Sequence, residues 1–155
     1  MKRIRLGSRA DIDTFVGLES LAIVGVSASG RGFGNNALRE LYDNGVRVFP
    51  VHRTAEAVQG IPCCDSLATL PEPVGGVLLV TPPAETEALV REAAAAGIRR
   101  VWMQQGAESA TAIALCAEHG ITAVAGHCIL MFQGKGPGIH RFHRGVRQFF
   151  GTLPL

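Results

Sequence analysis

A turn rich in glycine and serine follows the first strongly apolar run of the chain, and its chemistry suits phosphate groups. The apolar run covers residues 21–24, and the turn extends over residues 25–34. Glycines let the backbone approach a ligand closely, and the amides that open the next helix offer donors and a partial positive charge to an anion. The turn therefore predicts a binding site for a nucleotide's phosphates. Its candidate residues are Gly25, Ser27, Ala28, Ser29, Gly30, Arg31 and Gly34.

Further candidates follow the other apolar runs, because ligands of open parallel sheets lie beyond the carboxyl ends of the strands. These candidates are His52, Arg53, Thr81, Pro82, Gln104, Gly106, His127 and Cys128. The pair His52-Arg53 discriminates best, since enzymes that use NAD normally place Asp or Glu at the end of the second strand. A cationic pair there favours a phosphorylated ribose, as in NADP or coenzyme A. A solvated loop arginine is the alternative interpretation of Arg53.

The elements that position these residues alternate along the chain. Short apolar runs predict strands over residues 21–26, 46–51, 76–81, 99–103 and 121–125. Helices are expected over residues 35–44, 83–96 and 108–119, each ending just before a glycine that gives way to the next strand. Asp11 or Asp13 is expected to cap a short helix before the first strand, and residues 65–70 are expected to form a capped helical turn. The fold class predicted is α/β, a Rossmann-like doubly wound sheet of about five parallel strands with helices on both faces.

The composition is that of one globular domain. The chain has 155 residues, 47% of them hydrophobic, and no apolar run approaches the roughly 18 residues of a membrane span. No secretory segment follows the basic start, so we expect a cytoplasmic protein. The four cysteines lack disulfide or zinc spacing, so we interpret them as reduced thiols, with Cys116 in the core.

The C-terminal segment has a different pattern from the rest. We divide the chain into a domain over residues 1–131 and a tail over residues 132–155, which holds a glycine-rich linker and a basic amphipathic helix. The apolar side of that helix is expected to pack on this domain, on a second copy in a homodimer, or on a protein partner. Binding to a membrane surface or an acidic partner is the minority interpretation, and we expect no nucleic-acid partner.

Catalysis and metal binding have weaker support. Cys128 beside His127 has the residue types of a nucleophile and its base, but no carboxylate is evident to orient the histidine. His140 and His143 are three residues apart, a spacing that permits metal binding but is more often solvated surface. We therefore expect neither a catalytic residue nor a metal ligand.

Several of these segments resemble a known family. Residues 21–27 and 48–51 look like the first two strand ends of small bacterial CoA-binding proteins, and residues 101–106 look like a later one. These proteins are similar in turn to the CoA-binding domain of the α subunit of succinyl-CoA synthetase. The resemblance covers about residues 10–131. Its most specific element is the Trp-x-Gln-x-Gly stretch that begins at Trp102, combined with Cys128 after the fifth strand.

The resemblance implies a Rossmann-like CoA site. Residues 27–31 would hold the phosphates and ribose of the cofactor, with residues 52–53 and 81–82 in the same cleft and Gln104, Gly106 and Cys128 on the far wall. The chain departs from the family pattern in three places. Relatives commonly have Asp-Arg-Cys where residues 126–128 read Gly-His-Cys, and Asn-Pro where residues 52–53 read His-Arg. The tail lies outside the pattern altogether.

The sequence thus favours a protein that binds coenzyme A or an acyl-CoA through the first strand–helix turn, without catalysis of its own. An NADP-dependent oxidoreductase that reads the 2′-phosphate with Arg53 is one alternative. A regulatory or scaffold subunit with an unused nucleotide fold is the other.

Overall fold

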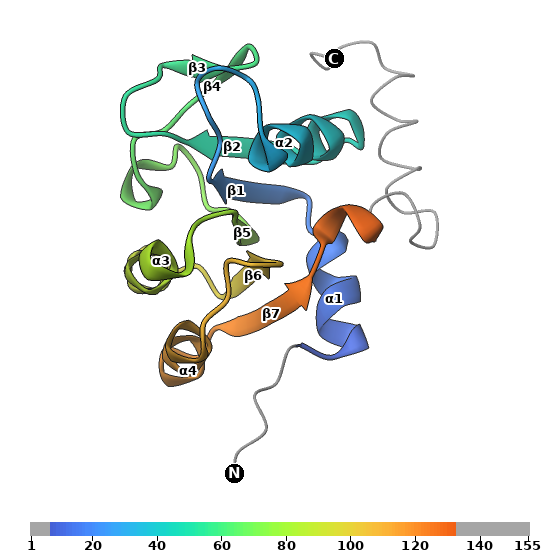
Figure 1. Ribbon diagram of the computed structural model, residues 1–155, viewed down its shortest axis with the longest axis vertical. Helices are drawn as coiled ribbons and strands as arrows, with labels where there is room; N and C mark the ends of the chain where they lie inside the picture. The colour runs from blue at the N-terminus through green and yellow to red at the C-terminus, as the bar shows by residue number, and fades with distance from the viewer. Residues whose placement is uncertain (1–6, 133–155) are drawn as a thin grey trace.

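Helices and strands alternate along the chain as the sequence predicts (Figure 1). The computed structural model describes residues 7–132. Its main strands are β1 (Ser20–Val24), β2 (Arg47–Val51), β5 (Gly76–Leu79), β6 (Arg100–Gln104) and β7 (Thr122–His127). Its helices are α1 (Arg9–Val16), α2 (Phe33–Asp43), α3 (Pro83–Ala95) and α4 (Ala110–Glu118). The shorter elements are β3 (Ala57–Val58), β4 (Ile61–Pro62) and the 3₁₀ turns η1 (Leu67–Thr69) and η2 (Ile129–Met131).

The five main strands form one parallel sheet in the order β2-β1-β5-β6-β7. The chain steps outward from β1 to β2, then returns past β1 to β5 and continues in the opposite direction. The strand order therefore reverses between β1 and β5, and a doubly wound sheet binds its ligands beyond the carboxyl ends of the strands at such a point. The predicted α/β fold class is confirmed.

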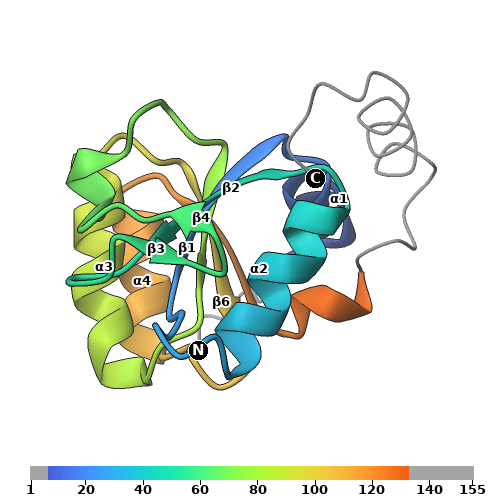
Figure 2. The ribbon, with the colours of Figure 1, turned by 90° about the horizontal axis from the view of Figure 1, so that it is seen from above.

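Helices cover both faces of the sheet, as Figure 2 shows in a view along the layers. On one face α1, α2 and η2 pack around Trp102, which is fully buried and lies 5.3 Å from Phe15 between ring centroids. On the other face α3, α4 and η1 pack around Val77 and Met103. Successive residues of a strand point to opposite faces of the sheet. Because helices cover both faces, the strand residues on each face must be apolar. Trp102 and Met103 are buried, and so is Cys116, as predicted.

Capping residues explain where the helices begin. The Ser8 hydroxyl accepts from the Asp11 amide of α1 and the Asp11 carboxylate accepts from the Ser8 amide, both at 3.0 Å. The expected cap at Asp11 or Asp13 is thus corrected, because the hydroxyl of Ser8 reaches the third helical amide. Within the capped turn predicted over residues 65–70, Ser66 occupies the N-cap of η1.

The connection between β2 and β5 holds a hairpin that the sequence analysis did not anticipate. β3 and β4 pair antiparallel, and Val58, only 1% exposed, joins the core on the α2 face. Cys64 then extends the sheet edge by one residue. Its backbone carbonyl accepts from the amide of His52 at 2.8 Å, and its backbone amide donates to the carbonyl of Pro50 at 2.9 Å. The edge position suits Pro50, which has no amide proton to donate.

The tail and the domain boundary stay predictions. Residues 133–155, with His140, His143 and the expected amphipathic helix, lie outside the described residues. Within residues 7–132 no helix has the length and apolar character needed to cross a membrane.

Candidate functional site

Gly25 brings the loop after β1 into contact with the end of β5, at the point where the strand order reverses. Its φ is 112°, and a Cβ at this position would overlap the carbonyl oxygen of Val80. The amide of Val80 donates to the carbonyl of Val24 at 2.8 Å. Only glycine satisfies both the positive φ and the close approach. Gly25 therefore lets the loop after β1 pass directly against the end of β5.

Gly34 brings the start of α2 onto the same loop. A Cβ on Gly34 would overlap the carbonyl oxygen of Gly25, and Gly34 is buried. The N-terminus of α2 can thus start directly over the end of β1. In dinucleotide-binding turns the last glycine has this same role in close helix–strand packing.

The loop between these glycines is held by hydrogen bonds centred on Ser27. Its amide donates to Oδ1 of Asn35 at 2.9 Å, and its carbonyl accepts from Nδ2 of Asn35 at 2.9 Å. Its hydroxyl donates to the carbonyl of Arg31 at 2.6 Å and lies 2.9 Å from Oγ of Ser29. Asn35 of α2 and the carbonyl of Arg31 therefore occupy both donors of Ser27, a residue predicted to bind phosphate. Asn35 was not among the predicted site residues.

Several backbone amides around the loop keep their donors available. Hydroxyl side chains cap α1 and α4, whereas α2 begins at Gly32 without a side-chain cap. Among residues 7–132 no hydrogen-bond partner is found for the amides of Ala28, Ser29, Phe33 and Gly34. The exposed guanidinium of Arg31 adds a positive charge. A helix N-terminus with free amides beside a cation suits an anion. Phe33 itself is half-buried and packs against the core.

At the end of β2, His52 shapes a turn and Arg53 adds a positive charge. Nδ1 of His52 accepts from the amides of Thr54 at 3.2 Å and Ala55 at 2.9 Å. The imidazole thus organises this turn through its Nδ1. Arg53 is exposed.

Four predicted residues meet where β5 and β6 end. A cavity of about 280 Å³ lies there, lined by Val80, Thr81, Pro82, Gln104, Gln105, Gly106 and Ala107. Buried hydrogen bonds join the two loops behind it. The Thr86 hydroxyl donates to the carbonyl of Ala107 at 2.8 Å and lies 2.9 Å from Oγ1 of Thr81. The cavity wall is thereby fixed to the first turn of α3.

The side chain of His127, at the end of β7, faces elsewhere. The His127 ring packs edge-on against Phe132 at 6.0 Å, beside Trp102, whose Nε1 donates to the His127 carbonyl at 3.1 Å. Oε1 of Gln104 accepts from the Ile129 amide at 3.1 Å and so holds the turn that contains Cys128. His127 does not line the 280 Å³ cavity. The rings of His127 and Phe132 thus pack beside Trp102 on the α1 face of the sheet.

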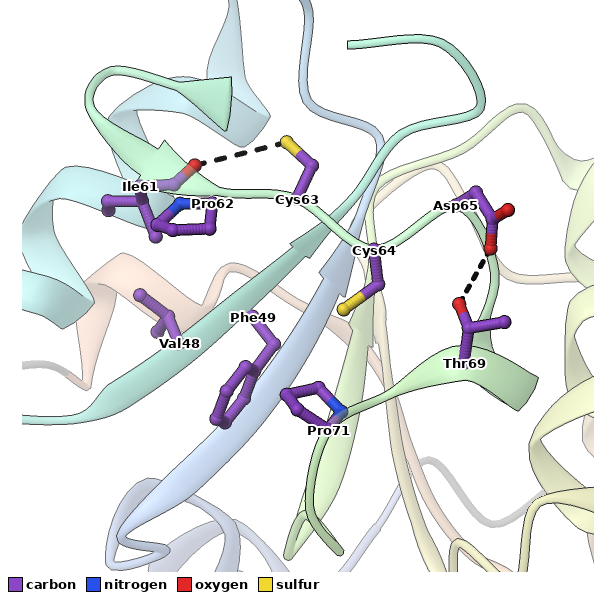
Figure 3. A pocket seen from close by; sticks show the side chains of 9 residues that line it. All are labelled: Val48, Phe49, Ile61, Pro62, Cys63, Cys64, Asp65, Thr69 and Pro71. Carbon is purple, nitrogen blue, oxygen red and sulfur yellow. Dashed lines mark hydrogen bonds between the residues drawn. The ribbon is translucent and has the colours of Figure 1, made fainter. Parts of the chain in front are cut away.

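A larger hollow of about 580 Å³ lies along the outer edge of β2 (Figure 3). It contains none of the predicted site residues. Its lining is Val48, Phe49, Ile61, Pro62, Cys63, Cys64, Asp65, Thr69 and Pro71. The side chains of Cys63 and Cys64 point to opposite sides of their segment, so they do not form a chelating pair. Burial raises the pKa of both thiols, with smaller contributions from Cys64 on Cys63 and from Asp65 on Cys64. Neutral thiols at a mostly apolar edge are unsuited to binding phosphate.

Solved structures share this fold. A conserved hypothetical protein from Pyrococcus furiosus is 31% identical with a TM-score of 0.70, covering 74% of this chain and 98% of that one. A hypothetical protein from Pyrococcus horikoshii OT3 is 27% identical with a TM-score of 0.76, covering 84% and 95%. The dinucleotide-forming acetyl-coenzyme A synthetase 1 from Ca. Korarchaeum cryptofilum is 19% identical with a TM-score of 0.60. That match covers 68% of this chain and 25% of the synthetase, and it shows likeness of fold alone.

A family model carries the assignment further than the individual structures. It is described as a CoA binding domain and matches residues 19–133, which include all five main strands. The match starts just before β1 and continues past η2, so it spans every strand end discussed above. The chain therefore belongs to the CoA binding domain family.

Proposed function

We propose that this protein binds coenzyme A or an acyl-CoA, with the pyrophosphate on the loop between β1 and α2. The observation that carries the proposal is the set of free amides at Ala28, Ser29, Phe33 and Gly34, placed at the reversal of strand order. Family membership supports the identity of the ligand. Several amides that donate to one anion, with the partial charge of a helix N-terminus, give a phosphate site that needs no metal ion.

Two arginines would offset the negative charges of the ligand's phosphate groups. Arg31 lies within the loop, where it would offset the pyrophosphate. Arg53 follows β2, where a doubly wound fold holds the ribose, and would pair with the ribose 3′-phosphate. Arginine suits this role because its planar fork matches phosphate oxygens. The 280 Å³ cavity at Thr81, Pro82, Gln104 and Gly106 would take the start of the pantetheine arm.

We further propose that binding occurs without catalysis by this chain. His127 packs against Phe132, and its partner in the suggested nucleophile–base pair, Cys128, lies at the N-cap of η2. A general base needs to reach the reacting proton and to be oriented by a third group. The contacts of His127 supply aromatic packing instead.

Isothermal titration calorimetry with CoA, dephospho-CoA and NADP⁺ tests the proposal. We expect CoA to bind with a dissociation constant of about 1–10 μM, and dephospho-CoA to bind about tenfold more weakly through loss of one charge-assisted contact. Arg53→Gln should remove most of that difference. Arg91→Gln, an exposed position on α3, is the matched control and should preserve it. Heat with NADP⁺ and none with CoA would contradict the proposal and favour the oxidoreductase alternative.

A further inference from the structure

One side chain, the amide of Asn35, holds the loop after β1 in shape. Asn35 lies in the first turn of α2 and is only 1% exposed. Oδ1 accepts from the amide of Ser27 at 2.9 Å and lies 3.3 Å from its hydroxyl. Nδ2 donates to the carbonyl of Ser27 at 2.9 Å and to Oε1 of Gln59 at 3.3 Å. The amide group thus uses its acceptor and both of its donors.

The chemistry of these bonds requires an asparagine. A carboxylate would accept from the Ser27 amide but would have no proton for the Ser27 carbonyl. An apolar side chain of the same size would leave the Ser27 amide without a partner and would leave its carbonyl only the amide of Gly30, at 3.2 Å. The pairing also explains why Ser27 does not offer its donors to a ligand. Its role is to anchor the loop, and the neighbouring amides remain free.

The bond to Gln59 reaches across the fold to the hairpin of β3 and β4. Gln59 has a φ of 52°, the one positive φ of a non-glycine residue among those described, and it forms the hairpin tip with Gly60. Val58, beside it, is buried in the core and anchors the hairpin. Cγ of Gln59 lies 3.9 Å from where a Cβ of Gly30 would stand. The tip of the hairpin therefore lies against both the loop after β1 and the Asn35 side chain.

We propose that Asn35 is a positioning residue for phosphate binding and that Gln59, from the β3–β4 hairpin, completes its arrangement. This inference rests on the proposed CoA function. By bonding both backbone groups of Ser27, Asn35 fixes the loop before the ligand arrives, so the free amides of Ala28 and Ser29 already have their binding geometry. Without the hydrogen bonds from Asn35, the ligand must also order the loop when it binds, and the entropy lost in that ordering lowers the affinity.

Affinity measurements with matched variants test the proposal. The variants are Asn35→Ala, Gln59→Ala, their combination, and the control Asn36→Ala, which changes the exposed neighbour on the same helix turn. We expect Asn35→Ala to weaken CoA binding about tenfold or more and Gln59→Ala about threefold. Asn36→Ala should stay within about twofold. Because both residues act through one arrangement, adding Gln59→Ala to Asn35→Ala should cost little more.

Amide exchange at Ser27, followed by NMR, distinguishes positioning from a general loss of stability. In the wild-type protein this amide should exchange slowly before CoA is added. In Asn35→Ala it should exchange at least about tenfold faster and become protected only once CoA is bound, while buried amides of β1 keep their wild-type protection. A merely structural role would accelerate exchange in β1 as well.

The outcomes distinguish a failure of this inference from a failure of the proposed CoA function. A wild-type protein without affinity for CoA would overturn the proposed function and this inference together. Wild-type affinity in Asn35→Ala, or additive losses in the double variant, would overturn this inference alone. If Asn35→Ala does not fold, the exposed Gln59→Ala variant still decides, because unchanged affinity there would refute the role of the hairpin.

Discussion

Replacing Gly34 by alanine tests the geometry of the site, because the sign of the change in the free energy of unfolding depends on that geometry. Gly34 is the second residue of α2, and its φ lies in the ordinary helical range. On helix propensity alone, alanine would stabilise the protein by up to about 1 kcal/mol. The structure predicts the opposite. The added methyl group would overlap the carbonyl oxygen of Gly25, which is backbone and cannot rotate away.

The magnitude follows from the two opposing terms. Overpacking a buried contact costs about 1–3 kcal/mol, and the upper part of that range applies when backbone must shift. After the propensity gain, we expect a net loss of about 1–2 kcal/mol in the free energy of unfolding of Gly34→Ala. At 2–4 °C per kcal/mol for a chain of this size, the melting temperature should fall by roughly 2–8 °C.

The assay combines urea unfolding with CoA titration. Asn36→Ala is the control, because it changes helix propensity in the same direction at an exposed helical position and should leave stability equal or slightly raised. Gly34→Ala should also weaken CoA binding at least about tenfold, since a shift of the helix start displaces the donor amides. A Gly34→Ala protein as stable as the control, with wild-type affinity, would refute the close helix–strand contact and the reasoning built on it.

Three further predictions concern stability. Gly25→Ala should lose at least about 2 kcal/mol more unfolding free energy than Gly97→Ala, because both have a positive φ but Gly97 has no atom within 4 Å of the added Cβ; equal losses would contradict the contact with β5. Thr86→Val should cost about 1–3 kcal/mol in urea unfolding, because the buried carbonyl of Ala107 loses its donor. Burial raises the pKa of Cys116 from 9.0 to about 12, so below pH 9 folded and unfolded chains both hold the thiol proton. Between pH 9 and 12 only the unfolded chain releases it, and wild-type stability should fall by about 1.4 kcal/mol per pH unit relative to Cys116→Ala. Parallel pH profiles of the two proteins would count against the burial of that thiol.

Much of the fold was predictable from local pattern. Runs such as residues 77–80 are apolar at every position, which indicates a strand covered on both faces, and the structure buries it between two helical layers. Glycines 45, 97 and 120 follow the helices and have φ values of 91°, 78° and 68°, as C-capping predicts. The strand expected over residues 21–26 ends at Val24, because Gly25 leaves the extended conformation.

The β3–β4 hairpin could not be predicted from local sequence pattern. Its strands have two residues each, too few to show a period of two. Its turn uses a glutamine in a left-handed conformation, for which the sequence has no signal except the following Gly60. What stabilises the hairpin is the burial of Val58 against α2, a contact between distant segments.

The sequence by itself determined the chemistry available at each strand end: a glycine-rich turn before a helix, a histidine and an arginine after β2, and no carboxylate to hold a ribose. Periodicity and glycine spacing settle such features because they depend on neighbours within a few residues. Only the tertiary structure decided which groups can act. It assigned Ser27 to Asn35, turned His127 toward Phe132, and left the amides of Ala28 and Ser29 free. These outcomes depend on hydrogen bonds and packing between segments 5 to 25 residues apart, where the fold and not the local pattern brings the partners together.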